Sequence, residues 1–167
     1  MLKIPVQIKG LFLSPGHNYF GHHGQEQGKS PLIEMSQIEC IAGRGIRGDR
    51  FLDYQQNYKG QITFFSQEVF DAVCQQLGVS GKQAGVSRRN VITEGVDLNA
   101  LIGRQFVLQG IELEGVCECK PCYWMDEAIA PGAELALNGR GGLRARILTA
   151  GVLRTGPASI DLLEENG

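Results

Sequence analysis

The sequence predicts a mostly β fold, a closed or semi-closed β-barrel with a few short helices. Three observations support this prediction: short apolar runs of strand character recur along the chain, glycine-containing turns separate them, and only one segment has a long helical pattern. The 23 glycines are about twice the roughly 7% that is typical of proteins, as many tight turns would require. No repeat, linker or low-complexity tract divides the chain, so residues 1–167 are expected to form a single domain.

The N-terminal half is expected to contain three strands and the most regular helix. The strands are 6–13, 33–42 and 61–65. A long polar loop separates the first two, and a glycine- and arginine-rich turn follows the second. The helix follows Ser66, a residue type that caps helix N-termini, and carries its apolar side chains on one face. It ends at Gly78, which suits the left-handed conformation common after helices.

The C-terminal half is expected to consist mainly of strands. These are 87–93, 105–108, 111–117, 143–148, 151–154 and 159–163. The Gln-Gly sequence at 109–110 predicts a tight turn between two of them, and the runs at 143–148 and 151–154 are expected to pair with each other. Asp97 is expected to cap a helical turn, and a second helical turn is expected over 126–130, before a proline.

Charge and composition exclude several classes of protein. The formal net charge of −2 lacks the basic excess of a dedicated nucleic-acid binder. No apolar run approaches the roughly 20 residues of a membrane span, and the N-terminus does not have the pattern of a signal peptide. Five cysteines, an odd number, do not indicate a disulfide framework, so a reducing cytoplasm is the expected location.

A cluster of three cysteines is the first candidate for chemistry. Cys117, Cys119 and Cys122 form a Cys-x-Cys-x-x-Cys motif. Thiolates are soft metal ligands, and the cation of Lys120 would favour the thiolate form of its neighbours. Cys117 continues an apolar alternation and is equally consistent with a core position, whereas Cys122 follows a proline in an expected loop. We therefore expect Cys122 to be the reactive thiol.

A structural zinc site is the alternative for this cluster. Such a site needs four ligands, so the fourth would have to be Cys40, Cys74 or one of the histidines, His17, His22 and His23. Cys40 and Cys74 have apolar neighbours in the sequence, and we expect both to be structural. The histidines are also compatible with acid–base chemistry near neutral pH, and the sequence assigns them no role.

Three segments rich in arginine form the second candidate site. The segment 43–48 fits G-x-G-x-x-G after a strand, but the helix that a dinucleotide site requires does not follow it. Its glycines are interleaved with arginines, and Arg50 follows two residues after Gly48, which suits a backbone nest for phosphate or another anion. The pair at 88–89 and the segment 139–146 repeat this chemistry. We expect the three segments to converge on an anionic ligand.

Arg88 and Asn90 are expected to line the same pocket as Cys122. On an extended strand these two residues share one face, whereas Arg89 points to the other. A guanidinium can bind phosphate through two parallel hydrogen bonds, and an asparagine amide offers one donor and one acceptor to the edge of a ring. The alternative is that Arg88 only makes a surface ion pair.

Several of these segments together resemble one family. Residues 45–51, 88–93, 101–103, 121–122 and 142–148 carry motifs in the order seen in MOSC domains, which occur at the C-terminus of molybdenum cofactor sulfurases and as stand-alone proteins. The resemblance runs from about residue 6 to residue 156, and the chain is similar to small stand-alone members of bacterial type. One departure is Pro157, which stands where the family often has the aspartate of Leu-x-x-Gly-Asp.

The resemblance implies a β-barrel that binds the molybdenum cofactor, molybdopterin. It implies that Cys122 is either a thiolate ligand of molybdenum or a carrier of persulfide sulfur. Arg88 and Asn90 match a motif that contacts the pterin and its phosphate in similar proteins. Gly48 and Arg50, in the Gly-Asp-Arg turn, are further implied cofactor contacts.

The resemblance leaves three functions open. These are a molybdenum-dependent oxidoreductase that reduces N-hydroxylated substrates, a non-catalytic carrier of the cofactor or its sulfur, and a zinc-stabilised β domain without molybdenum. The motifs are not accompanied by a desulfurase domain, so pyridoxal phosphate is not expected within this chain. A separate sulfur donor or electron-transfer partner is therefore implied.

Overall fold

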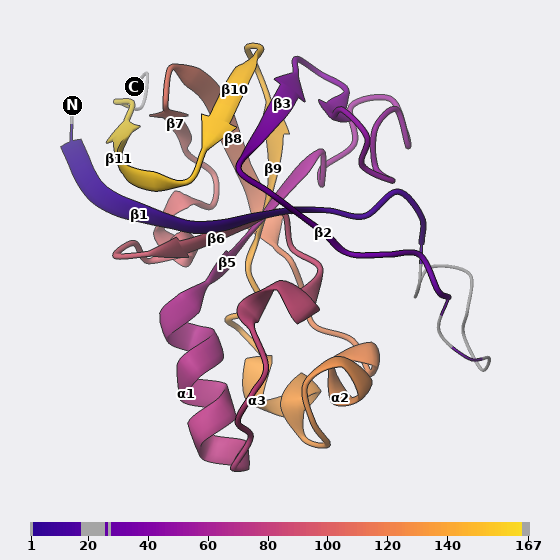
Figure 1. Cartoon of the computed structure of the whole chain (residues 1–167). Helices are drawn as coiled ribbons and strands as arrows, with labels where there is room; N and C mark the ends of the chain where they lie inside the picture. The colour runs from indigo at the N-terminus through magenta and orange to yellow at the C-terminus, as the bar shows by residue number, and fades with distance from the viewer. Residues whose placement is uncertain (1, 18–25, 27, 165–167) are drawn as a thin grey trace.

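Seven strands close into a β-barrel, which confirms the predicted mostly β fold (Figure 1). The structure is a computed structural model, and it describes residues 2–17, 26 and 28–164. The barrel strands are β1 (Leu2–Leu13), β5 (Ile62–Ser66), β6 (Val91–Glu94), β7 (Gln105–Leu108), β8 (Ile111–Glu118), β9 (Leu143–Ile147) and β11 (Gly156–Leu162). Their order around the barrel is β1, β11, β7, β8, β9, β5 and β6, which returns to β1.

The long first strand closes the barrel. It pairs with β11 from Leu2–Leu162 to Ile8–Gly156, so strands from opposite ends of the chain lie side by side. On its other edge it pairs with β6, where a register shift between Ile8 and Gly10 interrupts the ladder, and then with β2 (Ile33–Met35). Such irregularities bend a strand, and Figure 1 shows β1 curving across the front of the molecule.

Three short strands form a second sheet at one end of the barrel (Figure 1). These are β3 (Gln37–Ile41), β4 (Gly45–Ile46) and β10 (Gly151–Arg154), in the order β10-β3-β4. The prediction of a single strand over 33–42 is therefore wrong. The chain bends at Ser36, so that β2 joins the large sheet and β3 joins the small one.

The pairing expected between 143–148 and 151–154 is also wrong. β9 pairs with β8 and β5 in the barrel wall, whereas β10 pairs with β3. The buried Leu153 of β10 lies opposite the buried Ile38 of β3, and this apolar contact is made with a distant segment rather than with the preceding strand. Nearness in sequence was a poor guide here, although it correctly predicted the hairpin β7–β8 and its turn at 109–110.

Three helices lie together at the opposite end of the barrel from the small sheet (Figure 1). They are α1 (Gln67–Leu77), α2 (Trp124–Ala128) and α3 (Ala133–Leu137). The hydroxyl of Ser66 accepts a hydrogen bond from the Val69 N–H at 3.2 Å, and Gly78 ends α1 with a φ of 68°, as expected. α2 begins before the expected turn at 126–130, and α3 was not predicted. None of the helices among the described residues is long and apolar enough to cross a membrane.

The segment before β6 differs from the strand expected over 87–93. A 3₁₀ helix, η1 (Ala84–Ser87), ends at Arg88, which has a left-handed φ of 61° and donates its N–H to the Gly85 carbonyl at 2.9 Å. The strand itself begins only at Val91. The alternation of an extended strand therefore does not apply to residues 88–90. By contrast, the turn capped by Asp97 is present as η2 (Leu98–Leu101).

Apolar side chains fill two regions of the interior. The first lies among the barrel strands and includes Leu11, Phe64 and Phe106. The second lies between the barrel and the helices and includes Phe12 and Phe65. Neighbouring residues of one strand, such as Phe64 and Phe65, pack into different apolar regions, because successive side chains of a strand point to opposite faces.

Replacing Ser66 with alanine is expected to lower the free energy of unfolding by about 1 kcal/mol. The change removes the hydroxyl that accepts the Val69 N–H and leaves the N-terminus of α1 without its side-chain cap. Urea denaturation measures the loss. The matched control is Ser80→Ala, at an exposed position beyond the helix, which should leave stability unchanged. Equal stabilities of the two variants would contradict the capping role.

Candidate functional site

A pocket of about 240 Å³ brings together side chains from distant parts of the chain. Five cationic residues line it: Arg50, Arg88, Arg89, Lys120 and Arg144. No aspartate or glutamate is among the described residues that line it. Two thiols, those of Cys119 and Cys122, also line it. Positive charge concentrated in a hollow without carboxylates at its surface favours an anionic ligand.

Arg50 is a buried cation whose charge is only partly balanced. Its side chain is 11% exposed, and its Nη1 lies 3.5 Å from the buried carboxylate of Asp49. Burial lowers the pKa of Arg50 to about 10, Asp49 opposes this shift, and the positive charges of Arg88 and Arg89 add to it. The guanidinium remains charged at neutral pH. An anion in the pocket would raise its pKa again, which means that the site favours anion binding.

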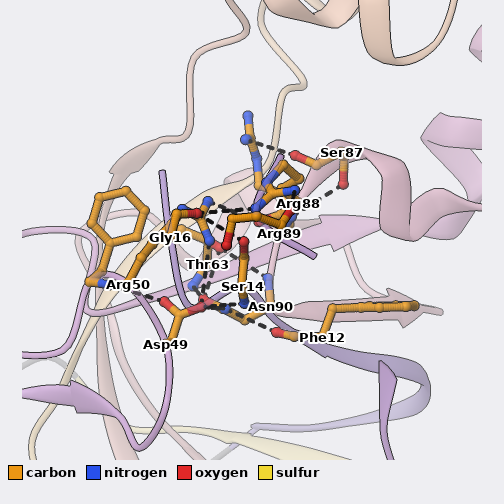
Figure 2. A network of polar contacts seen from close by, with 12 residues as sticks. Phe12, Ser14, Gly16, Asp49, Arg50, Thr63, Ser87, Arg88, Arg89 and Asn90 are labelled. Atoms are coloured by element: carbon orange, nitrogen blue, oxygen red, sulfur yellow. Dashed lines mark hydrogen bonds and ion pairs between the residues drawn. The ribbon is translucent and has the colours of Figure 1, made fainter. Parts of the chain in front are cut away.

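A buried hydrogen-bond network holds Asp49 in place (Figure 2). Its Oδ1 accepts from the Ser14 N–H at 3.0 Å and from the Asn90 Nδ2 at 3.4 Å. The Asn90 Oδ1 accepts from the N–H and the hydroxyl of Thr63 at 3.0 and 3.1 Å. The Asn90 Nδ2 also donates to the Phe12 carbonyl at 3.1 Å. Asn90 therefore connects β1, β5 and the turn that carries Arg50.

Asn90 and Gly48 support the pocket from behind. Asn90 is 3% exposed, its amide group is engaged in the network, and neither residue is among the described residues that line the pocket. Gly48 has a φ of 86°, which favours glycine and lets the turn present Asp49 and Arg50. The geometry thus gives both residues a positioning role.

Arg88 and Arg89 both line the pocket, which corrects the expectation that Arg89 points away. Arg88 is 7% exposed and donates to the carbonyl oxygens of Gly16 and Ser30 at 3.2 and 3.4 Å. Arg89 donates to the Cys119 carbonyl at 3.1 Å. The left-handed backbone at Arg88 replaces strand alternation and allows both side chains to reach the same hollow.

Other arginines of the same segments pair with carboxylates away from the pocket. Arg44 makes two hydrogen bonds to Asp53, and Arg47 makes two to Glu39, both on the exposed surface. Arg146 lies 3.4 Å from a glutamate of β8. The segments 43–50 and 139–146 therefore contribute only some of their arginines to the site, whereas the segment 88–89 contributes both.

Several lining residues are not among the individual site residues predicted from the sequence. Arg89, Lys120 and Arg144 are cationic, and Phe51, Tyr58 and Trp124 are aromatic. Arg89 and Phe51 could have been proposed from the sequence, because each directly follows a predicted site residue. Arg144 lies in the segment 139–146 that was expected to converge on an anionic ligand, whereas Tyr58 offered no signal, since only the folded chain brings the loop before β5 to the pocket.

Aromatic side chains form part of the pocket wall. Phe51 and Tyr58 stack with ring centroids 5.5 Å apart and 21° between their planes. His17 packs edge-on against Phe51 at 5.1 Å, and the Arg50 guanidinium lies 4.6 Å from the Phe51 centroid. Trp124 also lines the pocket. Such rings offer flat faces to a planar ligand.

The five cysteines differ in their surroundings. Cys122 is exposed, and Cys119 is 4% exposed. Burial raises the pKa of Cys40 to about 12, with a smaller contribution from the charge of Glu39, and burial also raises the pKa of Cys74. These surroundings suit structural roles for Cys40 and Cys74.

The described residues contain no group of three or more histidine, cysteine, aspartate or glutamate side chains that could hold a metal ion. The zinc alternative therefore has no ligand cluster in this part of the chain. His17 lies at the pocket, whereas His22 and His23 lie outside the described residues. A metal at this site would need ligands that a cofactor supplies in addition to a protein thiolate.

Mild alkylation of the folded protein at pH 8 is expected to modify Cys122 first and Cys40 last. The thiolate is the reactive form, and at this pH the raised pKa of Cys40 leaves it almost entirely protonated as well as buried. Peptide mapping over time measures the order. Unfolded protein, in which all five thiols should react at similar rates, is the control. Modification of Cys74 before Cys122 would contradict the assignment.

The fold and the site together define a small β-barrel protein with a cationic pocket and an exposed thiol at that pocket. A family model described as the MOSC domain matches residues 22–158. The chain belongs to the MOSC domain family, which is associated with molybdenum cofactor binding.

Solved structures support the assignment of the fold. The YuaD protein from Bacillus subtilis is 19% identical and superposes with a TM-score of 0.75, over 98% of this chain and 99% of that chain. YiiM from Geobacillus stearothermophilus is 17% identical, with a TM-score of 0.67 over 96% of this chain and 76% of its own. YiiM from Escherichia coli is 15% identical, with a TM-score of 0.64 over 99% and 71%. No curated protein matches the sequence significantly.

Proposed function

We propose that the protein binds the molybdenum cofactor in the cationic pocket, with the Cys122 thiolate as a ligand of molybdenum. The observation that carries this proposal is the combination of five cationic side chains, no carboxylate among the described lining residues, and an exposed thiol at one pocket. The cofactor is a pterin dithiolene with a phosphate group. The donor set suits it, because guanidinium groups bind phosphate and thiolates bind soft metal centres.

Each part of the site has a distinct role in this proposal. Arg50, Arg88 and Arg144 would hold the phosphate, and Cys122 would bind the metal. When bound, the cofactor would supply the two-electron redox chemistry needed to reduce an N-hydroxylated substrate. Asp49 holds Arg50 through an ion pair, and the aromatic wall would present flat faces to the pterin.

The pocket volume suggests how much of the cofactor it can enclose. At about 240 Å³ it is smaller than the roughly 300–1,000 Å³ of most small-molecule sites. Only part of the cofactor would therefore lie inside, and the remainder would lie at the open mouth, where Cys122 is exposed. This leaves the metal accessible to a substrate and to a separate electron-transfer partner.

A second candidate function is that of a carrier for the cofactor or for its sulfur, with Cys122 holding the sulfur as a persulfide. The presence of Cys119 in the same pocket favours it, because a neighbouring thiol can exchange sulfur with Cys122. A separate sulfur donor would load Cys122 in this case.

Metal and pterin analysis of the purified protein tests the proposal. Protein made in cells supplied with molybdate is expected to contain molybdenum and pterin in near-equal amounts. Turnover of an N-hydroxylated base with a chemical reductant, lost in Cys122→Ser but kept in Cys74→Ser, would identify the oxidoreductase. Loaded protein without turnover would favour the carrier. Protein free of both molybdenum and pterin, from cells that load other molybdenum enzymes, would overturn the proposal.

A further inference from the structure

Two thiols of the pocket form a Cys-x-x-Cys pair, with Lys120 and Pro121 between Cys119 and Cys122. This spacing is typical of dithiols that close to a disulfide. The two differ in access, because Cys122 is exposed and Cys119 is 4% exposed. A solute meets Cys122 first, whereas Cys119 is reached from within the pocket. The pair therefore combines a receiving thiol with a shielded one.

Cys119 is anchored beside a guanidinium. Its N–H donates to the Gly142 carbonyl at 2.8 Å, and its carbonyl accepts from Arg89 at 3.1 Å. Burial by itself would lower the pKa of Arg144, but that pKa is raised because Cys119 interacts with the guanidinium through charge and a hydrogen bond, with smaller contributions from Tyr58 and Cys117. Cys119 and the Arg144 guanidinium are therefore neighbours at the pocket, and a thiolate is the species that attacks a sulfur–sulfur bond.

The segment that carries Cys122 has no regular structure between the end of β8 and the start of α2. It folds closely over Gly141, where a Cβ atom would lie 2.4 Å from the Cys119 carbonyl oxygen and 2.7 Å from the Pro121 Cδ. The missing side chain at Gly141 thus allows this short loop to keep both thiols at one pocket. Cys117 is not among the described residues that line the pocket.

We propose that Cys119 is the resolving thiol for sulfur bound to Cys122. After a sulfur donor has left a persulfide on Cys122, the Cys119 thiolate attacks the Cys122 Sγ. A bond forms between the two Sγ atoms, the bond from the Cys122 Sγ to the outer sulfur breaks, and that sulfur leaves with the electron pair as hydrosulfide. A dithiol reductant returns the resulting disulfide to two thiols. The proposal rests on the second candidate function above only in taking Cys122 as the thiol that receives sulfur.

An aromatic disulfide reagent, dithiobis(nitrobenzoate), tests this step in the full chain without any cofactor. Reaction at Cys122 releases one coloured thiolate, and attack by Cys119 on the mixed disulfide releases the second from the same reagent molecule. With less than one equivalent of reagent, we expect two thiolates per reagent consumed, no lasting adduct, and a Cys119–Cys122 disulfide in the peptide map.

The Cys119→Ser variant is expected to release one thiolate and to keep its adduct on Cys122 at least tenfold longer than the wild type. Cys117→Ser, two residues earlier on β8, is the matched control and should behave as the wild type. The wild-type peptide map decides the question even if a serine at position 119 disturbs folding. A lasting adduct on Cys122, or a disulfide from Cys122 to Cys117, would overturn the proposal. Failure of the proposed function would instead appear as protein without molybdenum or pterin, which this thiol assay does not require.

Discussion

Replacing Arg50 with alanine is expected to lower cofactor occupancy at least tenfold. The guanidinium is buried in the pocket wall, and a charge-assisted hydrogen bond to phosphate contributes roughly 1.5–3 kcal/mol, which corresponds to about a tenfold to more than a hundredfold change in affinity. Molybdenum and pterin content of the purified variant measures the loss. Arg47→Ala, three residues earlier in the same turn, removes an exposed ion pair with Glu39 and should keep wild-type occupancy.

Arg50 also balances the charge of Asp49, so its loss could disturb the pocket without any direct contact to the cofactor. A second pair of variants controls for this effect. Arg144→Ala removes a lining cation, whereas Arg146→Ala, two residues on along β9, removes a cation that faces Glu114. We expect reduced occupancy only for the first of these. If Arg50→Ala and Arg144→Ala bind the cofactor as well as their controls do, the cationic pocket is not the binding site.

Replacing Asn90 with alanine is expected to lower the free energy of unfolding by roughly 3–5 kcal/mol. The change deprives the Thr63 N–H, the Phe12 carbonyl and the Asp49 carboxylate of a buried partner, and each unsatisfied buried group costs roughly 1–3 kcal/mol. Denaturant unfolding with the linear extrapolation measures the difference. The exposed Asn99, which makes one side-chain hydrogen bond, is the control, and Asn99→Ala should cost less than about 1.5 kcal/mol.

This prediction separates a positioning role from a ligand role. If Asn90 mainly contacted the pterin, the variant would lose cofactor but keep the stability of the cofactor-free protein. A cofactor-free Asn90→Ala protein as stable as the wild type would therefore contradict the structural role described here.

The elements that the sequence predicts well are those with local causes. α1 has its cap at Ser66, its apolar face and its terminal glycine within one short segment, and the hairpin β7–β8 has its turn residues between its strands. The pairing of β10 with β3 depends instead on contacts more than a hundred residues apart, and no pattern within either strand encodes its partner. The break in 87–93 depends on a left-handed Arg88, a conformation that is uncommon for a residue other than glycine.

The residue types of the site could be predicted from the sequence, but the choice of individual side chains could not. Arginine-rich segments and the exposed Cys122 were visible as residue types, and one or more cations from each segment do line a common pocket. Which arginines line it depends on which carboxylates lie nearby in space. Arg47 and Arg50 belong to one turn, but Glu39 on β3 neutralises the first, whereas burial beside Asp49 directs the second to the pocket. The same argument explains Asn90, whose polar partners all come from other segments.

The pairing of β1 with β11 sets the order in which the chain can fold during synthesis. Leu2 lies opposite Leu162, so β1 leaves the ribosome long before its partner β11 has been made. At roughly 5–20 residues per second, β1 waits roughly 8–30 s with one edge unpaired. An unpaired edge is open to strands of other chains, and contacts of such long sequence separation form slowly. Crowded synthesis of this protein is therefore expected to yield domain-swapped or aggregated chains unless a chaperone covers β1 until β11 arrives.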